Sequence, residues 1–223
     1  MNAAIWHEIG IGVGETLYMS VIATLLSYVI GLPLGIILAA TDKHGLKPNV
    51  IVNKGLGVIV NILRSIPFLI LFVTLIPLTR VLVGTTIGAP ATIVALVFAA
   101  SPFVARLTET SFKEVDSGVI EAALACGAST PKILIKVVIP EALPSLISNA
   151  AIAFVTVIGY SAMAGFCGGG GLGAIAINYG YYRGNTDIMI ITVVIIVAIV
   201  QIFQESGLKI AKLRDRRKKH KNK

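Results

Sequence analysis

The sequence is poor in charged residues, which make up only 13% of its 223 positions. Soluble globular domains carry roughly 25% charged residues, because their exterior must be polar. Hydrophobic residues reach 56% here, and several apolar stretches approach the roughly 20 residues with which a helix crosses about 30 Å of hydrocarbon. The deficit of charge therefore excludes an ordinary soluble domain and predicts an all-α, polytopic membrane protein.

Cysteine and histidine are also scarce. Cys126 and Cys167 form no C-x-x-C pair, and His7, His44 and His220 are isolated from one another. A metal site needs several such ligands at short spacing, and a disulfide framework needs a larger set of cysteines. We therefore expect neither a metal ion nor a disulfide on this chain.

Acidic residues are missing from the centres of the stretches that are expected to span the membrane. These five spans are residues 16–40, 58–77, 87–105, 146–164 and 188–207. Stand-alone secondary transporters usually need intramembrane acids or an inverted repeat, and a membrane enzyme needs convergent reactive side chains. The sequence shows neither feature, which argues against both classes.

Basic residues mark one side of the membrane. They fall between the first and second spans and again between the third and fourth, at Lys43, Lys47, Lys54, Arg106, Lys113, Lys132 and Lys136. Cytoplasmic loops carry an excess of Lys and Arg, so both loops are predicted to be cytoplasmic. Five spans then place the N-terminus outside and the C-terminus inside, in a plasma membrane.

The formal charge of +8 is concentrated at one end. Nine of the 19 Lys and Arg residues lie in the segment 209–223. A nucleic-acid-binding face would need basic residues interleaved with exposed aromatics, which the rest of the chain lacks. The segment is instead predicted to be a cytoplasmic tail that contacts anionic membrane lipid.

The segment 115–144 is too polar to span the membrane and too patterned to be a loose loop. A first short helix is predicted to end at Gly127, and a second to begin with Thr130 as N-cap and Pro131 at its first position. The second helix has an apolar face and is expected to lie along the membrane surface. The small residues Ala122 and Ala123 suit a docking surface, although the pattern alone fits an ordinary connector equally well.

Seven positions in this segment match a family motif at its fixed spacing: Glu121, Ala122, Ala123, Gly127, Val137, Ile139 and Pro140. They resemble the EAA motif of ABC importer permeases, which reads EAA, three residues, Gly, nine residues and I-x-L-P. Val137 replaces the Ile and Ile139 replaces the Leu, both conservatively. The resemblance implies the type I ABC importer permease fold, in which this segment is the cytoplasmic coupling helix that docks on a separate ATPase.

Two further stretches narrow the resemblance. Residues 64–68 resemble an element of amino-acid importer permeases, and residues 159–165, followed by glycines and residues 179–181, are similar to the methionine importers among them. This subgroup implies methionine as the solute, with another amino acid or small solute as the alternative. It also implies a homodimer, two ATPase subunits that hold ATP and magnesium, and an extracytoplasmic methionine-binding lipoprotein. No cofactor and no enzymatic activity are implied for this chain, which lacks a Walker A lysine.

Five residues are candidates for the translocation path or its gate: Arg64, Pro67, Tyr160, Ser161 and Met163. Physical reasoning leaves alternatives open for them. Arg64 also suits a snorkelling anchor, and Met163 suits gap filling. Small residues in 159–165 suit either a dimer interface or ordinary helix packing.

Glycines are dense after the fourth expected span, at Gly168, Gly169, Gly170, Gly171 and Gly173. Their spacing contains G-x-G-x-x-G, but no strand precedes it, so dinucleotide binding is not expected. We predict an outer-face loop that adapts to the solute-binding protein.

Overall fold

The computed structural model describes residues 3–215, which form helices and connecting turns without a strand. The all-α class is thus confirmed. Of the expected tail 209–223, the first residues continue the last helix, and residues 216–223 lie outside the described residues. In chain order the elements are α1 (Ala3–Thr41), α2 (Val50–Ser65), α3 (Phe68–Thr74), α4 (Ile76–Val83), α5 (Gly88–Lys113), α6 (Ser117–Ala125), α7 (Thr130–Ile133), the π-helix η1 (Leu134–Val138), α8 (Ile139–Ala164), the 3₁₀ turn η2 (Gly165–Cys167), α9 (Gly171–Ile175), the π-helix η3 (Ala176–Tyr181) and α10 (Thr186–Arg214).

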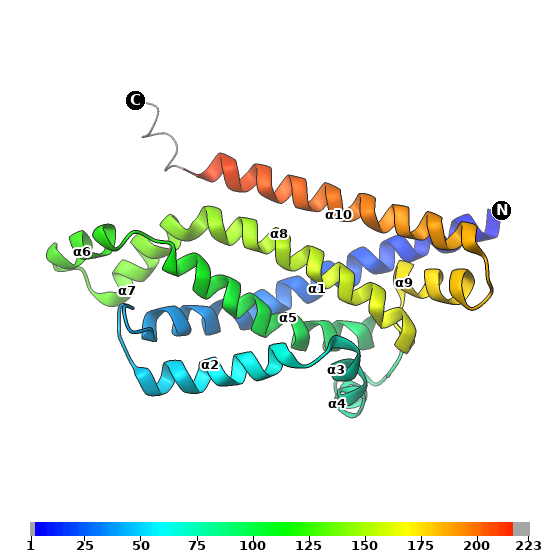
Figure 1. The fold of residues 1–223 in the computed structure, drawn as a ribbon, viewed down its shortest axis with the longest axis horizontal. Coiled ribbons are helices and arrows are strands. Elements are labelled where there is room, and N and C mark those ends of the chain that lie inside the picture. The colour runs from blue at the N-terminus through cyan, green and yellow to red at the C-terminus, as the bar shows by residue number, and fades with distance from the viewer. Residues whose placement is uncertain (1–2, 216–223) are drawn as a thin grey trace.

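The long helices run side by side along one axis (Figure 1). Among residues 3–215, four helical stretches are long and apolar enough to cross a membrane, namely α1, α5, the continuous helix Thr130–Cys167 and α10. The N-terminus and α9 lie at one end of this bundle, whereas α6 and α7 lie at the other. We call these the α9 end and the α6 end.

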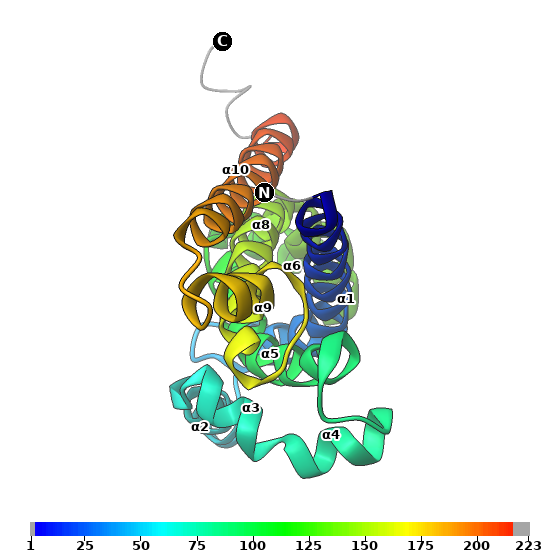
Figure 2. The same ribbon diagram turned by 90° about the vertical axis from the view of Figure 1, so that its right-hand side faces the viewer.

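The stretch expected to be a continuous span at 58–77 is broken. α2 ends at Ser65 and α3 begins at Phe68, with 98° between their axes. Pro67 explains the break, because a proline disfavours the helical conformation of the residue before it. Ile66 is accordingly extended, with φ −77° and ψ 123°. α3 and α4 therefore leave the direction of α2, and they lie to one side of the other helices when viewed from the α9 end (Figure 2).

Close packing of α1 on α5 forms the centre of the fold. A Cβ at Gly31 would lie 2.6 Å from the Ser101 carbonyl oxygen, and one at Gly35 would lie 2.5 Å from the Ala105 carbonyl oxygen. Small residues four positions apart let helix backbones approach in this way. This contact explains why glycines lie on both sides of Pro33 within α1, a continuous helix of 39 residues.

The second half of the polar segment is not a separate surface helix. α7, η1 and α8 form one continuous helix from Thr130. Pro140 lacks the N–H of a regular helix bond, and just before it the Ile139 N–H donates to the Leu134 carbonyl, a π-type bond. The expected apolar face exists, but its residues Ile133 and Val138 are buried against Phe112 in the protein rather than against lipid.

The start of this helix also differs from expectation. Ser129, rather than Thr130, holds the N-cap position, because its carbonyl accepts the Ile133 N–H at 2.9 Å. Pro131 is therefore the second helical residue. The Ser129 side chain makes no capping hydrogen bond.

Candidate functional site

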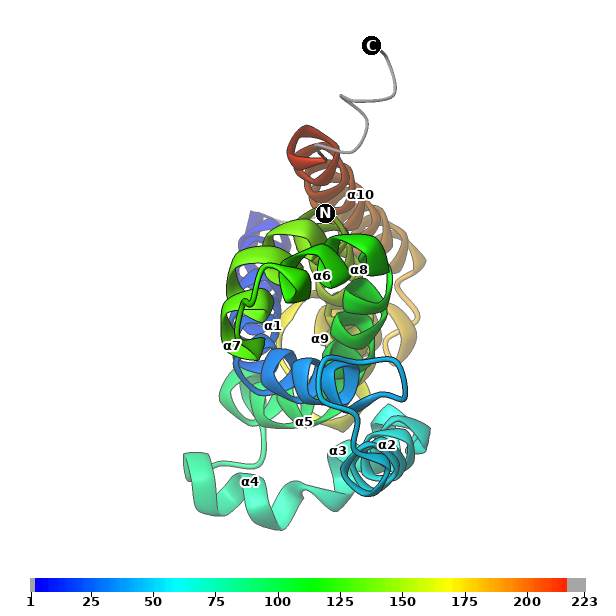
Figure 3. The same ribbon diagram turned by 90° about the vertical axis from the view of Figure 1, so that its left-hand side faces the viewer.

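Helix α6 carries three of the seven predicted docking residues, Glu121, Ala122 and Ala123, at the α6 end, where Figure 3 shows the helix nearest the viewer. Asp116 caps the helix, since its carboxylate accepts the Gly118 N–H at 2.7 Å. None of the nine residues of α6 is buried. Glu121 and Ala122 are exposed, and Ala123 is half-buried against the apolar cluster around Phe112. The helix is thus ordered at its start and open to a partner along its length.

The glycine of the motif ends α6 in a defined way. Gly127 has φ +72°, its N–H donates to the Leu124 carbonyl, and the Ala128 N–H donates to the Ala123 carbonyl. These two bonds form a Schellman motif, in which Ala128 and Ala123 also pack in one apolar cluster. The spacing between the alanines and the glycine is therefore the spacing that this helix end requires.

The rest of the motif lies at the π turn. Val137 is half-buried in η1, Ile139 is half-buried at the start of α8, and Pro140 is exposed next to it. Val137 and Ile139 pack on the same apolar cluster as Ala123. The structure thus brings both halves of the motif together on one small core beneath α6.

A cavity of about 490 Å³ separates α6 from the ends of α1 and α5. Its apolar wall includes Phe112, Ile120 and Leu124, and its polar lining includes Glu121 and Lys113. Within residues 3–215, α6 makes its main contacts with α7 and η1. Helix α6 therefore faces the end of α1 mainly across this cavity.

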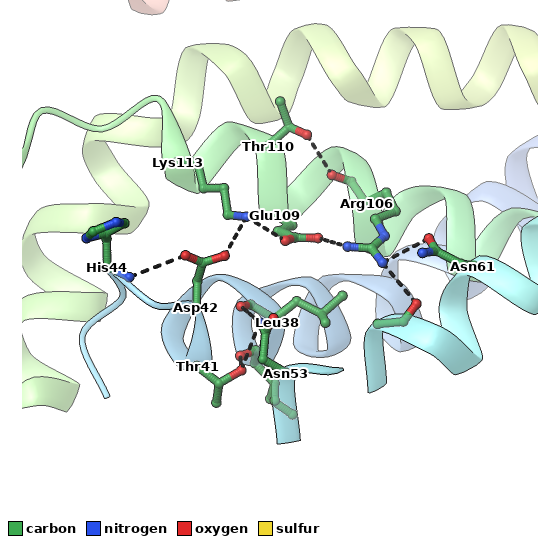
Figure 4. Close-up of polar contacts among 12 residues, drawn as sticks. Leu38, Thr41, Asp42, His44, Asn53, Asn61, Arg106, Glu109, Thr110 and Lys113 are labelled. Atoms are coloured by element: carbon green, nitrogen blue, oxygen red, sulfur yellow. Dashed lines mark hydrogen bonds and ion pairs between the residues drawn. The ribbon is translucent and has the colours of Figure 1, made fainter. Parts of the chain in front are cut away.

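Next to this cavity, ion pairs connect α5 to α1 (Figure 4). Lys113 Nζ lies 2.7 Å from Asp42 Oδ2 and 2.8 Å from Glu109 Oε1. The hydrogen bond from Lys113 is the largest cause that lowers the pKa of the Asp42 carboxyl below its ordinary value, and the His44 backbone N–H adds to it. Asp42 is therefore held as a carboxylate.

The same network reaches α2 through Arg106. One guanidinium nitrogen lies 2.5 Å from Glu109 Oε2, and the other donates to the Gly57 carbonyl and to Asn61 Oδ1, both at 2.9 Å. A second polar contact ties α2 to α1, because Asn53 Nδ2 donates to the Leu38 carbonyl at 2.8 Å. Sequence reasoning used Arg106 and Lys113 only to orient the loop and did not find their partners, although the spacing 106, 109 and 113 marks one helix face.

The candidate path residues fall into two groups. Pro67 lies at the α2–α3 break, and the next residue, Phe68, stacks on the Tyr160 ring with centroids 4.9 Å apart and planes 4° apart. Pro67 and Tyr160 are therefore brought together by Phe68. Arg64 is exposed, and its guanidinium lies 6.0 Å from the centroid of the Phe103 ring, at the outer limit of a cation–π contact.

Ser161 and Met163 point in different directions. Ser161 is buried, so its side chain does not reach the surface. Its hydroxyl donates to the Ile158 carbonyl of its own helix at 2.8 Å. Met163 is exposed, in a stripe along α8 that also includes Ile152 and Gly159 and continues to Phe166 of η2. Met163 thus lies on a free apolar face, whereas Ser161 lies in the core.

The glycine run, expected to form an adaptable outer-face loop, is packed closely against neighbouring backbone in the structure. Gly169, Gly171 and Gly173 are buried, and a Cβ at Gly173 would collide with the Ala162 backbone. The chain reverses here from α8 into α9 against α1. The glycines serve close backbone approach, and only Gly168 of the five is exposed.

Two residues of α1 hold this turn and were missed at the sequence level. The N-cap position of α9 is Gly170, which has no side chain to cap the helix. Glu15 Oε2 instead accepts the Gly171 N–H at 2.7 Å, and Thr16 Oγ1 accepts the Leu172 N–H at 2.9 Å. The carboxylate of Glu15 at the start of an apolar stretch was the only sign of this contact in the sequence. Its partner, Gly171, lies 156 residues away.

The described residues contain no group of three or more His, Cys, Asp or Glu side chains placed to hold a metal ion. The geometry is that of a bundle of long apolar helices with a short exposed helix, α6, at one end. Residues 31–205 match the model of the binding-protein-dependent transport system inner membrane component family. The chain belongs to this family. The importer-permease resemblance is thereby confirmed, and the chain is a permease subunit rather than an enzyme.

Relatives of this permease carry names that specify a solute. The Bacillus subtilis methionine import system permease protein MetP is 46% identical over 203 residues, which is 91% of each chain. The Escherichia coli D-methionine transport system permease protein MetI is 47% identical over 154 residues, or 69% of this chain and 71% of that one.

Solved structures agree with the fold. A chain of the MetNI methionine ABC transporter in inward-facing conformations has a TM-score of 0.95 and 42% identity, and it covers 97% of this chain and 100% of its own. A chain from a crystal structure of an amino acid ABC transporter with histidines has a TM-score of 0.68 at 22% identity, a likeness of fold alone. The type I importer permease fold expected for this permease is thus confirmed.

Proposed function

We propose that this permease carries methionine into the cytoplasm as the membrane-spanning subunit of an ATP-driven importer. The observation that carries the proposal is α6, a capped helix without a buried residue, at the docking position of the family motif. Identity of 46% to a methionine import permease over 91% of the chain supports methionine as the solute rather than another amino acid.

The assembly is a dimer of this chain with two ATPase subunits, which hold ATP and magnesium. Each ATPase contacts one α6 through Glu121, Ala122, Ala123 and the exposed turn at Gly127. Closure of the ATPases on ATP displaces α6, and the helices of the two permease copies alternate between inward-open and outward-open arrangements. No covalent step occurs on this chain, since its work is a change of helix packing.

The α6 end faces the cytoplasm in this proposal. Lysines lie in the two loops at this end, between α1 and α2 and between α5 and α8, and near the end of α10. This distribution follows the positive-inside pattern. The α9 end, with the N-terminus, then faces outward and receives methionine from a binding protein tethered as a lipoprotein. The turn at 168–173 contributes a rigid outer surface to this encounter.

The exposed stripe of α8 is the proposed face between the two copies. A Cβ added at Gly159 would meet nothing within 4 Å, so a second helix has room to approach. Met163 lies on this stripe, and Tyr160 beside it is stacked on Phe68. The path then runs between the two copies, with Tyr160 and Met163 as its lining and Pro67 as the bend next to it.

Vesicle uptake tests this function. The permease is reconstituted with the ATPase and binding protein encoded beside it, and labelled methionine is supplied outside with ATP inside. We expect ATP-dependent accumulation that excess unlabelled methionine abolishes and an unrelated amino acid does not. Accumulation of a different amino acid only would overturn methionine, and uptake without any ATPase would overturn the importer mechanism.

A further inference from the structure

Four charged residues form a chain of ion pairs between α5 and the residue that follows α1, near the α6 end (Figure 4). Asp42 follows α1, and Lys113, Glu109 and Arg106 lie on one face of α5. Their charges alternate in sign, and each neighbouring pair is within 2.8 Å. Arg106 continues the chain to the Gly57 carbonyl and Asn61 of α2.

The centre of this chain is buried. The Glu109 side chain is 8% exposed, and its two oxygens contact different cations. A buried carboxylate costs several kcal/mol unless it is paired. Removing the charge of Glu109 would leave Arg106 and Lys113 without the partner that they share. Apolar packing would hold three helices together at less cost. The network therefore contributes a defined geometry that apolar side chains do not.

Its location relates it to the docking helix. α5 ends at Lys113, and only three residues separate this end from α6. α6 buries no residue and faces α1 across the 490 Å³ cavity. Displacement of α6 would thus reach α1 and α2 through the end of α5, which ion pairs connect to the end of α1 and hydrogen bonds from Arg106 connect to α2.

We propose that Asp42, Arg106, Glu109 and Lys113 are positioning residues that make α1, α2 and α5 move as one body when the ATPase displaces α6. α2 leads directly to the bend at Pro67 and the Phe68–Tyr160 stack, so this body connects docking to the proposed path. The network sets how much methionine moves for each ATP hydrolysed. The inference rests on the proposed import function.

The test measures ATP hydrolysis and methionine uptake on the same reconstituted complex. Glu109→Gln keeps the shape of the side chain and removes its charge. We expect uptake per ATP to fall about tenfold, in the range of known coupling effects, while the hydrolysis rate stays within about twofold. Glu205→Gln on the exposed surface of α10 is the matched control, and its ratio should equal that of the unmodified complex.

A second variant keeps the test decisive if Glu109→Gln fails to assemble. Asn61→Ala alters an exposed side chain and removes only one bond from Arg106 to α2. We expect a fall of about twofold to threefold in uptake per ATP. If the assembled variants kept the uptake per ATP of the unmodified complex, and that complex took up methionine normally, this inference alone would be overturned. No uptake by the unmodified complex would overturn the import function and the inference with it.

Discussion

The two ends of the helix bundle use glycine in opposite ways. At the α6 end, Gly127 has φ +72° and a Cβ there would meet nothing within 4 Å. At the α9 end, Gly171 has φ +81°, and a Cβ there would lie 2.5 Å from Thr16 Oγ1. The first glycine ends a helix whose surface is open, where we propose that a partner docks, and the second allows the chain to pack on itself. A motif glycine thus indicates docking only where its surroundings are open.

The largest expected effect comes from crowding the packed end. Gly171→Ala adds a methyl group at a left-handed residue with backbone and side-chain neighbours, so we expect a loss of about 3 kcal/mol in stability and poor yield from membranes. Thermal unfolding in detergent measures this loss. Gly10→Ala, at a glycine of α1 with open space, is the control and should unfold at or slightly above the temperature of the unmodified chain, because alanine favours a helix. Equal stability of both variants would contradict the packed turn.

Strain at the open end should affect binding more than folding. Gly127→Val forces a β-branched residue into the left-handed conformation, which misplaces the end of α6. We expect about a tenfold weaker ATPase affinity, equivalent to about 1.4 kcal/mol, and a smaller loss of thermal stability than in Gly171→Ala, because no packed neighbour is displaced.

Gly84→Val is the matched control for that affinity measurement. Gly84 has φ +75° and an equally open Cβ position, but it ends α4 outside the docking segment. Equal weakening by both variants would show that α6 is not the docking helix.

The smallest effect concerns the caps that α1 supplies to α9. Thr16→Val keeps the shape of the side chain but leaves the buried Leu172 N–H without its acceptor, so we expect about 1 kcal/mol of destabilisation. In Thr24→Val, on the same helix, the lost hydroxyl has no partner among the described residues. We expect no destabilisation there, and an equal loss in both variants, read by thermal unfolding, would exclude the capping role.

Sequence was sufficient for the features that depend on composition and local spacing. Long apolar runs predicted the helices of α1, α5, α8 and α10, and the tendency of glycine to end helices predicted the end of α6 at Gly127. The break at Pro67 was also readable, because the residue before a proline avoids the helical conformation. It was missed because the apolar run continues through it to Pro77.

Features that depend on distant partners were not readable. Nothing near the glycines in sequence indicates that Glu15 and Thr16 cap α9. Glu109 stands out in sequence only as an acid near the end of an apolar stretch, and its burial depends on Arg106, Lys113 and the approach of α2. The same composition therefore suited a mobile loop and a packed turn, and only the fold distinguishes them.

The most direct test of the account is a single experiment on Glu121→Lys that reads ATPase co-purification and methionine uptake together. α6 buries no residue, so the variant should insert and unfold like the unmodified permease. We expect it to lose both the ATPase and the uptake, while Glu205→Lys on α10 keeps both. Normal co-purification and uptake in Glu121→Lys would contradict the assignment of α6 as the docking site.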